Sequence, residues 1–309
     1  MVGRFAPSPT GDLHLGNLRT ALIAAVSARA GDGVFLLRDE DLDFVTSSPD
    51  WAQRQHEDLA AMSIRWSDEV VRQSERFALY RAAISTLEAT GVVYPCFCSR
   101  REIRAEIEAA TRAPHSPLPL GAYPGTCREL SVEDRAARMA EGRQPAFRLR
   151  TDGEEYEIRD RVAGVYVGAV DDVVLARADG VPAYNLAVVV DDALQGVTEV
   201  VRGDDLLSST PRQVHLQRLL GYETPEYAHI PLVCSPSGSR LAKRDGAVTL
   251  RDLYERGVSA VEVRDALARS FGCDPAGTST DPIGEWATNW SWSQLPTTPV
   301  DIADLGLPV

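Results

Sequence analysis

The 309-residue sequence lacks the features of several large classes of protein. No stretch approaches the roughly 20 consecutive apolar residues that a membrane-spanning helix needs, and no basic segment followed by an apolar one opens the chain, as a secretory signal would. Positive charge is also scarce, because 32 lysines and arginines face 45 acidic residues and leave a net charge of −13. This charge argues against a protein that coats nucleic acid nonspecifically. We therefore expect a cytoplasmic chain without membrane contacts.

Cysteine is too sparse and too unevenly spaced for a disulfide framework, with five residues in the whole chain. Cys96 and Cys98 nevertheless lie close together, and Cys127 is the only other cysteine nearby. In a cytosolic chain this grouping indicates a metal site. Three thiolates and one further ligand would complete a tetrahedral zinc site, and His115 offers the commoner type of fourth ligand.

The glycine-rich fingerprint of dinucleotide-binding folds is absent, because no G-x-G-x-x-G follows the first apolar segment. Residues 2–5 instead predict a strand, and two prolines and a glycine within 7–11 predict a rigid turn. From residue 18 onward the apolar residues fall at helical spacing. His14 and Gly16 are therefore expected at a strand-to-helix junction, where free backbone N–H groups and the helix dipole favour a phosphate.

A second apolar segment at 34–37 predicts a buried strand, and a hydrophobic content of 44% is enough for a core. Strand, helix and strand with a short return form a βαβ unit, which predicts an α/β fold with a parallel, doubly wound sheet. The second strand runs into an acidic stretch at 38–43 that holds four carboxylates. Because ligands of such sheets bind beyond the carboxyl ends of the strands, these carboxylates are expected to hold an ammonium group or a metal.

Further elements follow from local signals. Ser48 and Pro49 predict the N-cap and first residue of a helix that reaches about residue 62. Residues 186–190 alone predict a core strand or a helix, and 230–234 predict a strand. The residues after 272 are expected to form an irregular tail packed back on the fold.

Three segments together resemble class I aminoacyl-tRNA synthetases of the glutamyl and glutaminyl type. The run Arg-Phe-Ala-Pro-Ser-Pro-Thr-Gly-Asp-Leu-His-Leu-Gly-Asn that begins at Arg4 is similar to their HIGH signature. The acidic stretch resembles an Arg-x-Glu-Asp-x-Asp segment whose glutamate binds the α-amino group of the amino acid, which implies that role for Glu40. The loop around Arg240 and Lys243 resembles the KMSKS motif, although Arg240 replaces its first lysine and Ala242 its serine.

The resemblance implies a Rossmann-like sheet and assigns a role to each matching residue. Tyr184 and Arg202 resemble the glutamate-binding pair of the family, and arginine suits a carboxylate because it binds both oxygens. His14 and Lys243 are the implied catalytic residues, which would stabilise the phosphoryl oxygens of ATP from opposite sides, with Mg²⁺ on the phosphates. The implied glutamate-binding residues are Arg4, Phe5, Ala6, Pro7, Ser8, Glu40, Tyr184 and Arg202, and the implied ATP-binding residues are His14, Gly16, Asn17, Arg240 and Lys243.

The spacing Cys-x-Cys…Tyr-x3-Cys further resembles the zinc site of glutamyl-Q tRNA(Asp) synthetases. It implies one structural Zn²⁺ per chain, held by Cys96, Cys98, Tyr123 and Cys127. Few residues follow the KMSKS-like loop, so we expect no anticodon-binding domain of the kind that glutamyl-tRNA synthetases carry. The resemblance then implies ATP, L-glutamate and a queuosine-containing tRNA(Asp) as partners of a monomeric enzyme, with queuosine in the anticodon loop as the acceptor.

The predicted organisation has four parts. Residues 1–92 and 181–272 are the two halves of the catalytic domain, 93–180 form a zinc-containing insertion, and 273–309 form the tail. Three other functions stay open: a truncated glutamyl-tRNA synthetase that charges the tRNA 3′ end, a catalytically silent paralogue, and a nucleotidyltransferase that acts on a small acid. The altered Arg240 and Ala242 positions motivate the silent paralogue.

Overall fold

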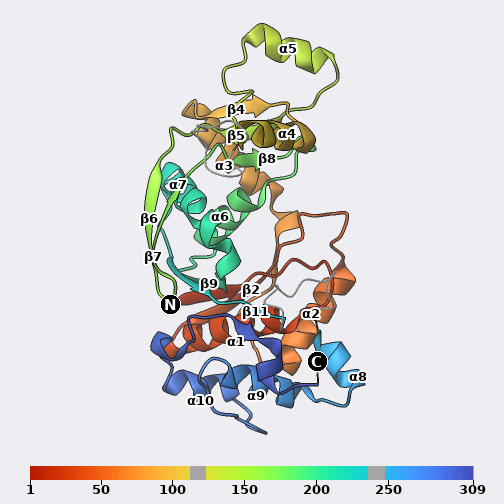
Figure 1. Ribbon diagram of the computed structural model, residues 1–309, viewed down its shortest axis with the longest axis vertical. Helices are drawn as coiled ribbons and strands as arrows, with labels where there is room; N and C mark the ends of the chain where they lie inside the picture. The colour runs from red at the N-terminus through yellow and green to blue at the C-terminus, as the bar shows by residue number, and fades with distance from the viewer. Residues whose placement is uncertain (112–122, 236–247, 309) are drawn as a thin grey trace.

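The computed structural model describes residues 1–111, 123–235 and 248–308 (Figure 1). The predicted residues His115, Arg240 and Lys243 lie outside these ranges. A seven-stranded sheet crosses the middle of the molecule, with a small insertion above it and the C-terminal helices below it (Figure 1).

The large sheet has the strand order β3-β2-β1-β9-β10-β6-β7. All neighbouring strands are parallel except the last pair, which forms a hairpin. The predicted α/β fold with a mainly parallel sheet is therefore confirmed. The strands are β1 (Val2–Phe5), β2 (Val34–Asp39), β3 (Val71–Arg72), β6 (Glu155–Asp160), β7 (Gly164–Ala169), β9 (Glu199–Gly203) and β10 (Glu226–Ile230).

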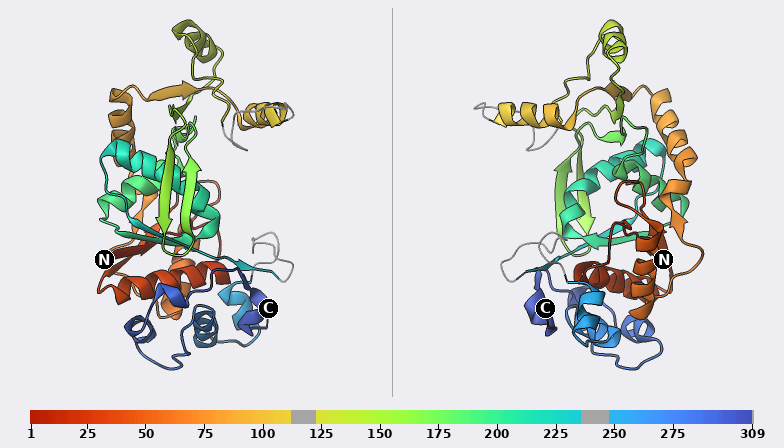
Figure 2. Two further views of the ribbon diagram at one scale, coloured as in Figure 1. Left: turned by 60° about the vertical axis from the view of Figure 1, so that its left-hand side comes forward. Right: turned by 90° about the vertical axis from the view of Figure 1, so that its right-hand side faces the viewer.

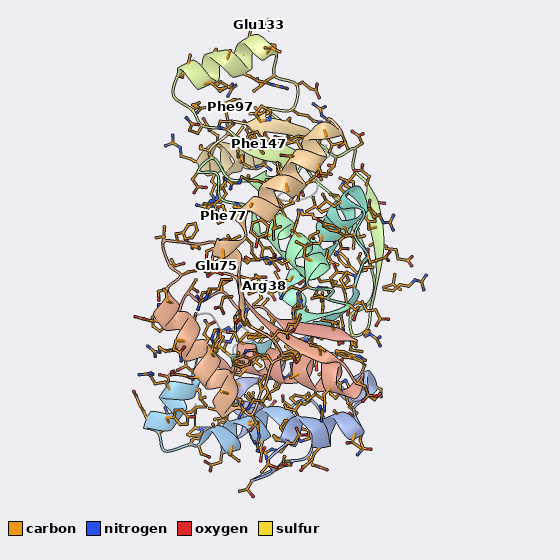
Figure 3. All side chains as sticks on the ribbon, turned by 180° about the vertical axis from the view of Figure 1, so that it is seen from behind. Arg38, Glu75, Phe77, Phe97, Glu133 and Phe147 are labelled. Atoms are coloured by element: carbon orange, nitrogen blue, oxygen red, sulfur yellow. The ribbon has the colours of Figure 1, made fainter. Side chains whose placement is uncertain are left out.

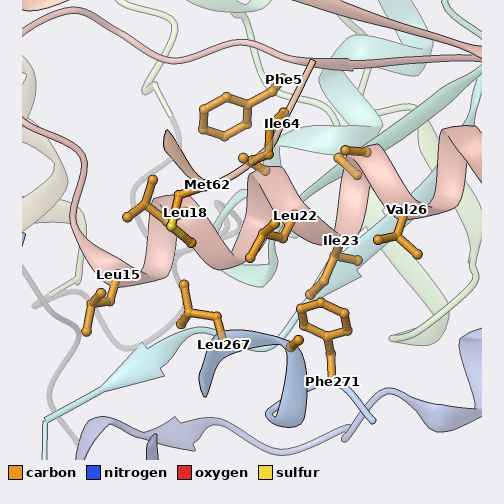
Figure 4. Close-up of a cluster of buried hydrophobic side chains, with 14 of the residues drawn as sticks. Phe5, Leu15, Leu18, Leu22, Ile23, Val26, Met62, Ile64, Leu267 and Phe271 are labelled. Carbon is orange, nitrogen blue, oxygen red and sulfur yellow. The ribbon is translucent and has the colours of Figure 1, made fainter. Parts of the chain in front are cut away.

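Helix α1 (Leu15–Ala30) connects β1 to β2 and forms the predicted βαβ unit. It begins three residues before the predicted start, because His14 caps it. The Asn17 backbone N–H donates to His14 Nδ1 and the His14 backbone N–H donates to Asn17 Oδ1, both at 3.3 Å. The residues of α1 from Leu18 to Ala28, apart from Thr20, are buried. Their apolar side chains pack against Met62, Ile64 and Phe271 among others (Figure 4).

Helices cover both faces of the sheet. On the side of α1 lie α2 (Pro49–Ala61), α8 (Leu250–Glu255), α9 (Ala260–Arg269) and α10 (Pro282–Thr288); on the other side lie α6 (Tyr184–Leu194) and α7 (Thr210–Leu220) (Figure 1). Ser48 caps α2 as predicted, through its contact with the Trp51 N–H at 3.2 Å. Residues 186–190 belong to a helix. Short 3₁₀ turns occupy Gln73–Glu75, Asp204–Ser209, Trp292–Gln294 and Ile302–Leu305.

The strand predicted at 230–234 is wrong in its bounds. β10 ends at Ile230, and β11 (Val233–Cys234) forms a separate two-stranded sheet with β12 (Val300–Asp301). Pro231 lies at the break, and proline has no N–H with which to continue the ladder. The segment predicted to be irregular contains β12 and also α10, which begins where Asp281 caps the Gly284 N–H at 3.0 Å.

The insertion forms the top of the molecule. Its antiparallel sheet consists of β4 (Val93–Cys96), β5 (Ala146–Leu149) and β8 (Val174–Ala176), and α3 (Phe77–Ala89) leads into it. Helix α4 (Arg100–Thr111) projects sideways and α5 (Val132–Ala140) lies at the tip (Figure 2). The hairpin β6–β7 lies within the predicted boundaries of the insertion but pairs with β10 of the large sheet. Among the described helices, none combines the length and apolar character needed to cross a membrane.

Candidate active site

A cavity of about 390 Å³ opens beyond the carboxyl ends of β1 and β9. The strand order reverses between these two strands, which is the position where open α/β sheets bind ligands. The structure brings together here every predicted glutamate- and ATP-binding residue that it describes. They are Arg4, Phe5, Ala6, Pro7, Ser8, His14, Gly16, Asn17, Glu40, Tyr184 and Arg202.

The floor of the site is a buried network of charges. Asp192 Oδ1 accepts from Arg38 Nη2 at 2.7 Å and from Arg4 Nε at 3.2 Å. Burial opposes ionisation of Asp192, but the two guanidinium groups outweigh it and lower the pKa of this carboxyl. Arg4 is thereby fixed in place by a carboxylate of the protein. Figure 3 shows Arg38 deep in the middle of the molecule.

The negative charge of Glu40 is less well stabilised by neighbouring cations than that of Asp192. Its side chain is only 8% exposed, and it contacts Arg38 Nη2 at 3.4 Å. Burial raises the pKa of Glu40, and Arg38 and Arg4 oppose that shift only in part. An ammonium group in the cavity would supply the missing positive charge, which agrees with the predicted role of Glu40 in binding an α-amino group.

Arg202 is a buried cation that neutral groups hold. Its Nε donates to His229 Nε2 at 2.9 Å, its Nη1 to Gln213 Oε1 at 2.8 Å and its Nη2 to Thr210 Oγ1 at 2.9 Å. The guanidinium also lies 5.3 Å from the centre of the Tyr227 ring. Unlike Arg4 and Arg38, Arg202 forms no ion pair with any carboxylate in the described part of the chain. Its positive charge is thus available to an anion in the cavity.

His14 stands at the start of α1, beside the cavity. Since its Nδ1 accepts from the Asn17 N–H, the neutral ring carries its proton on Nε2. Gly16 is closely packed, because a Cβ there would lie 3.0 Å from His14 Cε1 and would displace the ring. The helix N-terminus and the Nε2–H of His14 thus provide donors for a phosphate.

The chain also returns to this place after the KMSKS-like segment. The backbone oxygen of Val248 accepts from the Leu15 N–H at 3.1 Å. The backbone of Thr249 pairs with that of His14 in an isolated antiparallel β-bridge. The roles of Arg240 and Lys243 stay predictions.

A cysteine cluster lies in the insertion, apart from the cavity. The sulfurs of Cys96, Cys98 and Cys127 all lie within 4.8 Å of one another. The Tyr123 hydroxyl lies 3.3 Å from Cys96 Sγ and 3.5 Å from Cys98 Sγ. The structure thus brings all four predicted zinc ligands together. Sulfurs bound to one zinc ion lie about 3.8 Å apart for tetrahedral bonds of about 2.3 Å, so this donor set fits the ion.

Hydrogen bonding within the cluster favours the thiolate of one cysteine, whereas it raises the pKa of Cys98, and burial raises that of the Tyr123 hydroxyl. Hydrogen bonding from Cys98 lowers the pKa of Cys96 to about 4, against the effect of burial. The guanidinium of Arg148 lies 3.8 Å from the centre of the Tyr123 ring. Phe97, which directly follows β4, packs into the cluster (Figure 3). Ile103 of α4 packs against it. The cluster therefore fastens α4 to the insertion.

Sequence reasoning missed several residues that build the site. Arg38 opens the acidic stretch and Asp192 closes the apolar run of α6, so both were visible beside predicted residues. His229, Thr210 and Gln213 carry no comparable signal, because only the packing of α7 and β10 on β9 brings them to Arg202.

Residues 1–279 match the family of tRNA synthetases class I (E and Q), catalytic domain. The chain belongs to this family and is accordingly a ligase of the class I aminoacyl-tRNA synthetase type. A glutamyl-Q tRNA(Asp) synthetase from Nocardia farcinica is 55% identical over 305 residues, which cover 99% of this chain and 94% of that protein. The predicted resemblance to the glutamyl-Q tRNA(Asp) synthetases is therefore confirmed.

Two further relatives carry the name of the glutamate ligases. A glutamate–tRNA ligase 1 from Halorhodospira halophila is 41% identical over 307 residues, which cover 90% of this chain and 64% of that protein. The crystal structure of a glutamate tRNA ligase from Elizabethkingia meningosepticum, in complex with its amino acid, matches with a TM-score of 0.81 and 26% identity. That match covers 99% of this chain and 68% of the ligase, and agrees with the observed α/β architecture.

Proposed function

We propose that the enzyme activates L-glutamate with ATP as glutamyl-adenylate and transfers the glutamate to queuosine in the anticodon loop of tRNA(Asp). One observation carries the choice of glutamate: Arg202 and Glu40 line the same cavity. Arg202 is buried and has no carboxylate partner among the described residues, and the positive charges near Glu40 only partly offset the cost of burying its carboxylate. Arg202 suits the side-chain carboxylate of glutamate, and Glu40 suits its α-ammonium group. Tyr184 lines the same cavity, and the charges of both residues act on its hydroxyl.

The first step needs alignment and charge stabilisation. The α-carboxylate of glutamate attacks the α-phosphorus of ATP, and pyrophosphate leaves. Because this nucleophile is already ionised at pH 7, no general base is required. His14 would donate its Nε2–H to the phosphoryl oxygens beside the N-terminus of α1, and Lys243 would act from the opposite side. Mg²⁺ would neutralise charge on the ATP phosphates.

The proposed acceptor, queuosine in tRNA(Asp), is chosen from the names of the similar proteins and from how much of each the alignment covers. Alignment with the relative named glutamyl-Q tRNA(Asp) synthetase runs over 94% of that protein, whereas alignment with the glutamate–tRNA ligase 1 runs over 64% of it. Charging of a tRNA 3′ end is the second candidate. A silent paralogue is disfavoured because His14, Glu40 and Arg202 line one cavity.

ATP–pyrophosphate exchange with each of the 20 amino acids, without tRNA, tests the first step. Exchange with glutamate alone is expected. Exchange with no amino acid, with or without tRNA, would refute the enzymatic proposal. Labelled glutamate is then offered with tRNA(Asp) that contains queuosine, with tRNA(Asp) that lacks it, and with tRNA(Glu). Transfer to the first tRNA only is expected, and transfer to tRNA(Glu) would favour the second candidate.

The surface of α4 supports an RNA partner. Arg100, Arg101 and Arg104 are exposed and line a shallow depression of about 450 Å³. Among the described residues they form no ion pair, whereas Arg143 and Arg128 in the same insertion are paired with carboxylates. In a chain with a net charge of −13, such a group of unpaired arginines suits RNA phosphates.

Replacing these three arginines by glutamate is expected to weaken tRNA binding about tenfold or more. Each lost phosphate contact should also reduce the slope of log K against log salt concentration by about 1. Glutamate-dependent exchange should be unchanged, because α4 is remote from the cavity. Arg159→Glu, at a position that is 83% exposed on β6, is the matched control. An unchanged affinity and salt slope in the triple variant would contradict the proposed surface.

Zinc at the cysteine cluster is part of the proposal. Cys127→Ser is expected to abolish binding of about one zinc per chain and to lower the unfolding temperature, since a structural zinc contributes folding energy. Cys273→Ser, a buried cysteine of the main core, is the control. Metal analysis of Tyr123→Phe and His115→Ala decides the fourth ligand. Zinc retained by Tyr123→Phe and lost by His115→Ala would reject Tyr123.

A further inference from the structure

Behind Arg202 lies a buried carboxylate–imidazole pair that has no part in the proposed chemistry so far. Asp160, at the end of β6, accepts from the His229 ring at Nδ1 (2.5 Å) and from the backbone N–H groups of His229, Val162 and Ala163 at 2.8–3.1 Å. The side chains of Asp160 and His229 are both 0% exposed. With this many N–H donors around it, Asp160 is an ionised carboxylate; burial opposes this, but the hydrogen bonds lower its pKa.

The pair determines which nitrogen of His229 carries the proton. Because Nδ1 faces the Asp160 carboxylate, Nδ1 is the protonated nitrogen and Nε2 presents a lone pair. Arg202 Nε donates to this lone pair at 2.9 Å. A neutral His229 is therefore an acceptor for a buried cation, and it determines the plane of the guanidinium.

The remaining contacts of Arg202 leave two donors for a ligand. Nε, Nη1 and Nη2 each donate one hydrogen bond, to His229, Gln213 and Thr210 respectively. A guanidinium has five N–H groups, so one on Nη1 and one on Nη2 stay without an acceptor among the described residues. These two can bind both oxygens of one carboxylate only if Nε is held in its present direction.

We propose that His229, oriented by Asp160, is a positioning residue that aligns Arg202 on the side-chain carboxylate of glutamate and thereby sets the preference for glutamate over uncharged amino acids. This inference rests on the proposed function of Arg202. Neither Asp160 nor His229 touches the substrate; both act through the guanidinium.

The alignment depends on pH through His229. The groups that face its ring are Asp160 on β6, Arg202 on β9, Asp204 in the turn after β9, the Thr210 hydroxyl on α7, and Tyr227 on its own strand, 5.8 Å away between ring centres. Burial lowers the pKa of His229; Asp160 opposes this shift, and Arg202 reinforces it.

A second proton on the His229 ring would sit on Nε2, which could then no longer accept from the Arg202 Nε–H. It would also place a positive imidazolium beside the positive guanidinium. Glutamate binding is therefore expected to be constant above the pKa of His229 and to weaken as the pH falls through that value, which lies below the usual value for histidine. Protonation of the glutamate side chain also weakens binding at low pH, and a variant without the imidazole reports that effect alone.

The test measures kcat and KM for glutamate, glutamine and ATP in pyrophosphate exchange. His229→Leu is expected to raise the KM for glutamate about tenfold to hundredfold, the usual effect of losing a hydrogen bond to a charged group. The KM for ATP should not change, and the ratio of kcat/KM for glutamate to that for glutamine should fall by the same factor. His229→Gln offers Oε1 as an acceptor, so it should recover most of the affinity and lose the fall of 1/KM at acid pH.

Several outcomes would overturn the inference. One is an unchanged KM in His229→Leu while Arg202→Leu abolishes exchange; another is an equal loss for glutamate and glutamine. If His229→Leu does not fold, the pH profiles of the unsubstituted enzyme and of His229→Gln decide: profiles of 1/KM for glutamate that coincide overturn the inference. Absence of glutamate exchange in the unsubstituted enzyme would instead refute the proposed function, so the two failures are distinguishable.

Discussion

Replacing Arg202 by leucine is expected to lower kcat/KM for glutamate in pyrophosphate exchange by about a thousandfold. The substitution removes a buried charge that lines the cavity, together with its N–H donors, so the side-chain carboxylate of glutamate would be buried without a partner. Losing one side of a buried charge pair costs on the order of 4 kcal/mol, which corresponds to about three orders of magnitude in affinity. Steady-state exchange at varied glutamate concentration measures the effect.

Two further variants make this result specific. Arg202→Lys keeps the charge but cannot keep the contacts to His229, Gln213 and Thr210 and also bind two oxygens, so an intermediate loss is expected. Arg159→Leu, on an exposed arginine of β6, should leave exchange unchanged. Thermal unfolding confirms that each variant is folded. An Arg202→Leu enzyme with nearly normal kcat/KM for glutamate would show that this arginine does not bind the substrate.

The second large effect is expected at His14. His14→Ala should lower kcat about 10²- to 10³-fold, by comparison with the loss of one preorganised donor to a developing oxyanion. His14 has a second role, because its Nδ1 caps α1. Loss of a side-chain cap costs roughly 1 kcal/mol of stability, so the alanine variant changes activity and folding together.

His14→Asn separates these two roles. Asparagine is a favourable N-cap residue and can accept from the Asn17 N–H, but it lacks the imidazole Nε2–H. We expect this variant to unfold near the temperature of the unsubstituted enzyme and to lose as much kcat as His14→Ala. Substantial activity in His14→Asn would mean that the cap matters and that the ring donor does not take part in the chemistry.

Local signals in the sequence were sufficient for the elements that depend on neighbours along the chain. The βαβ unit follows from apolar periodicity, and the bounds of α2 follow from Ser48 and Pro49. The start of α1 was placed too late, because histidine is not a common N-cap and the pattern of apolar residues did not reveal its contact with Asn17. The predicted strand at 230–234 failed because periodicity alone does not show that Pro231 divides it between two sheets.

Contacts between distant segments could not be predicted in this way. Arg38 and Asp192 are far apart in the chain. They meet only because α6 packs on the sheet that contains β2. The hairpin β6–β7 resembles part of the insertion in the sequence, yet its pairing with β10 brings Asp160 to His229. Such contacts depend on which surfaces are buried against one another, and no local pattern encodes that.

Through its resemblance to a known family, the sequence by itself determined the class of enzyme, eleven of the residues that line the cavity and the four candidate zinc ligands. It did so because these residues lie in short segments that match the motifs of that family. The tertiary structure alone decided how the charges are distributed. It paired Arg4 and Arg38 with Asp192, and it held Arg202 among His229, Gln213 and Thr210. That difference decides which arginine can bind a substrate carboxylate, because a buried cation already neutralised by the protein has little charge left for a ligand.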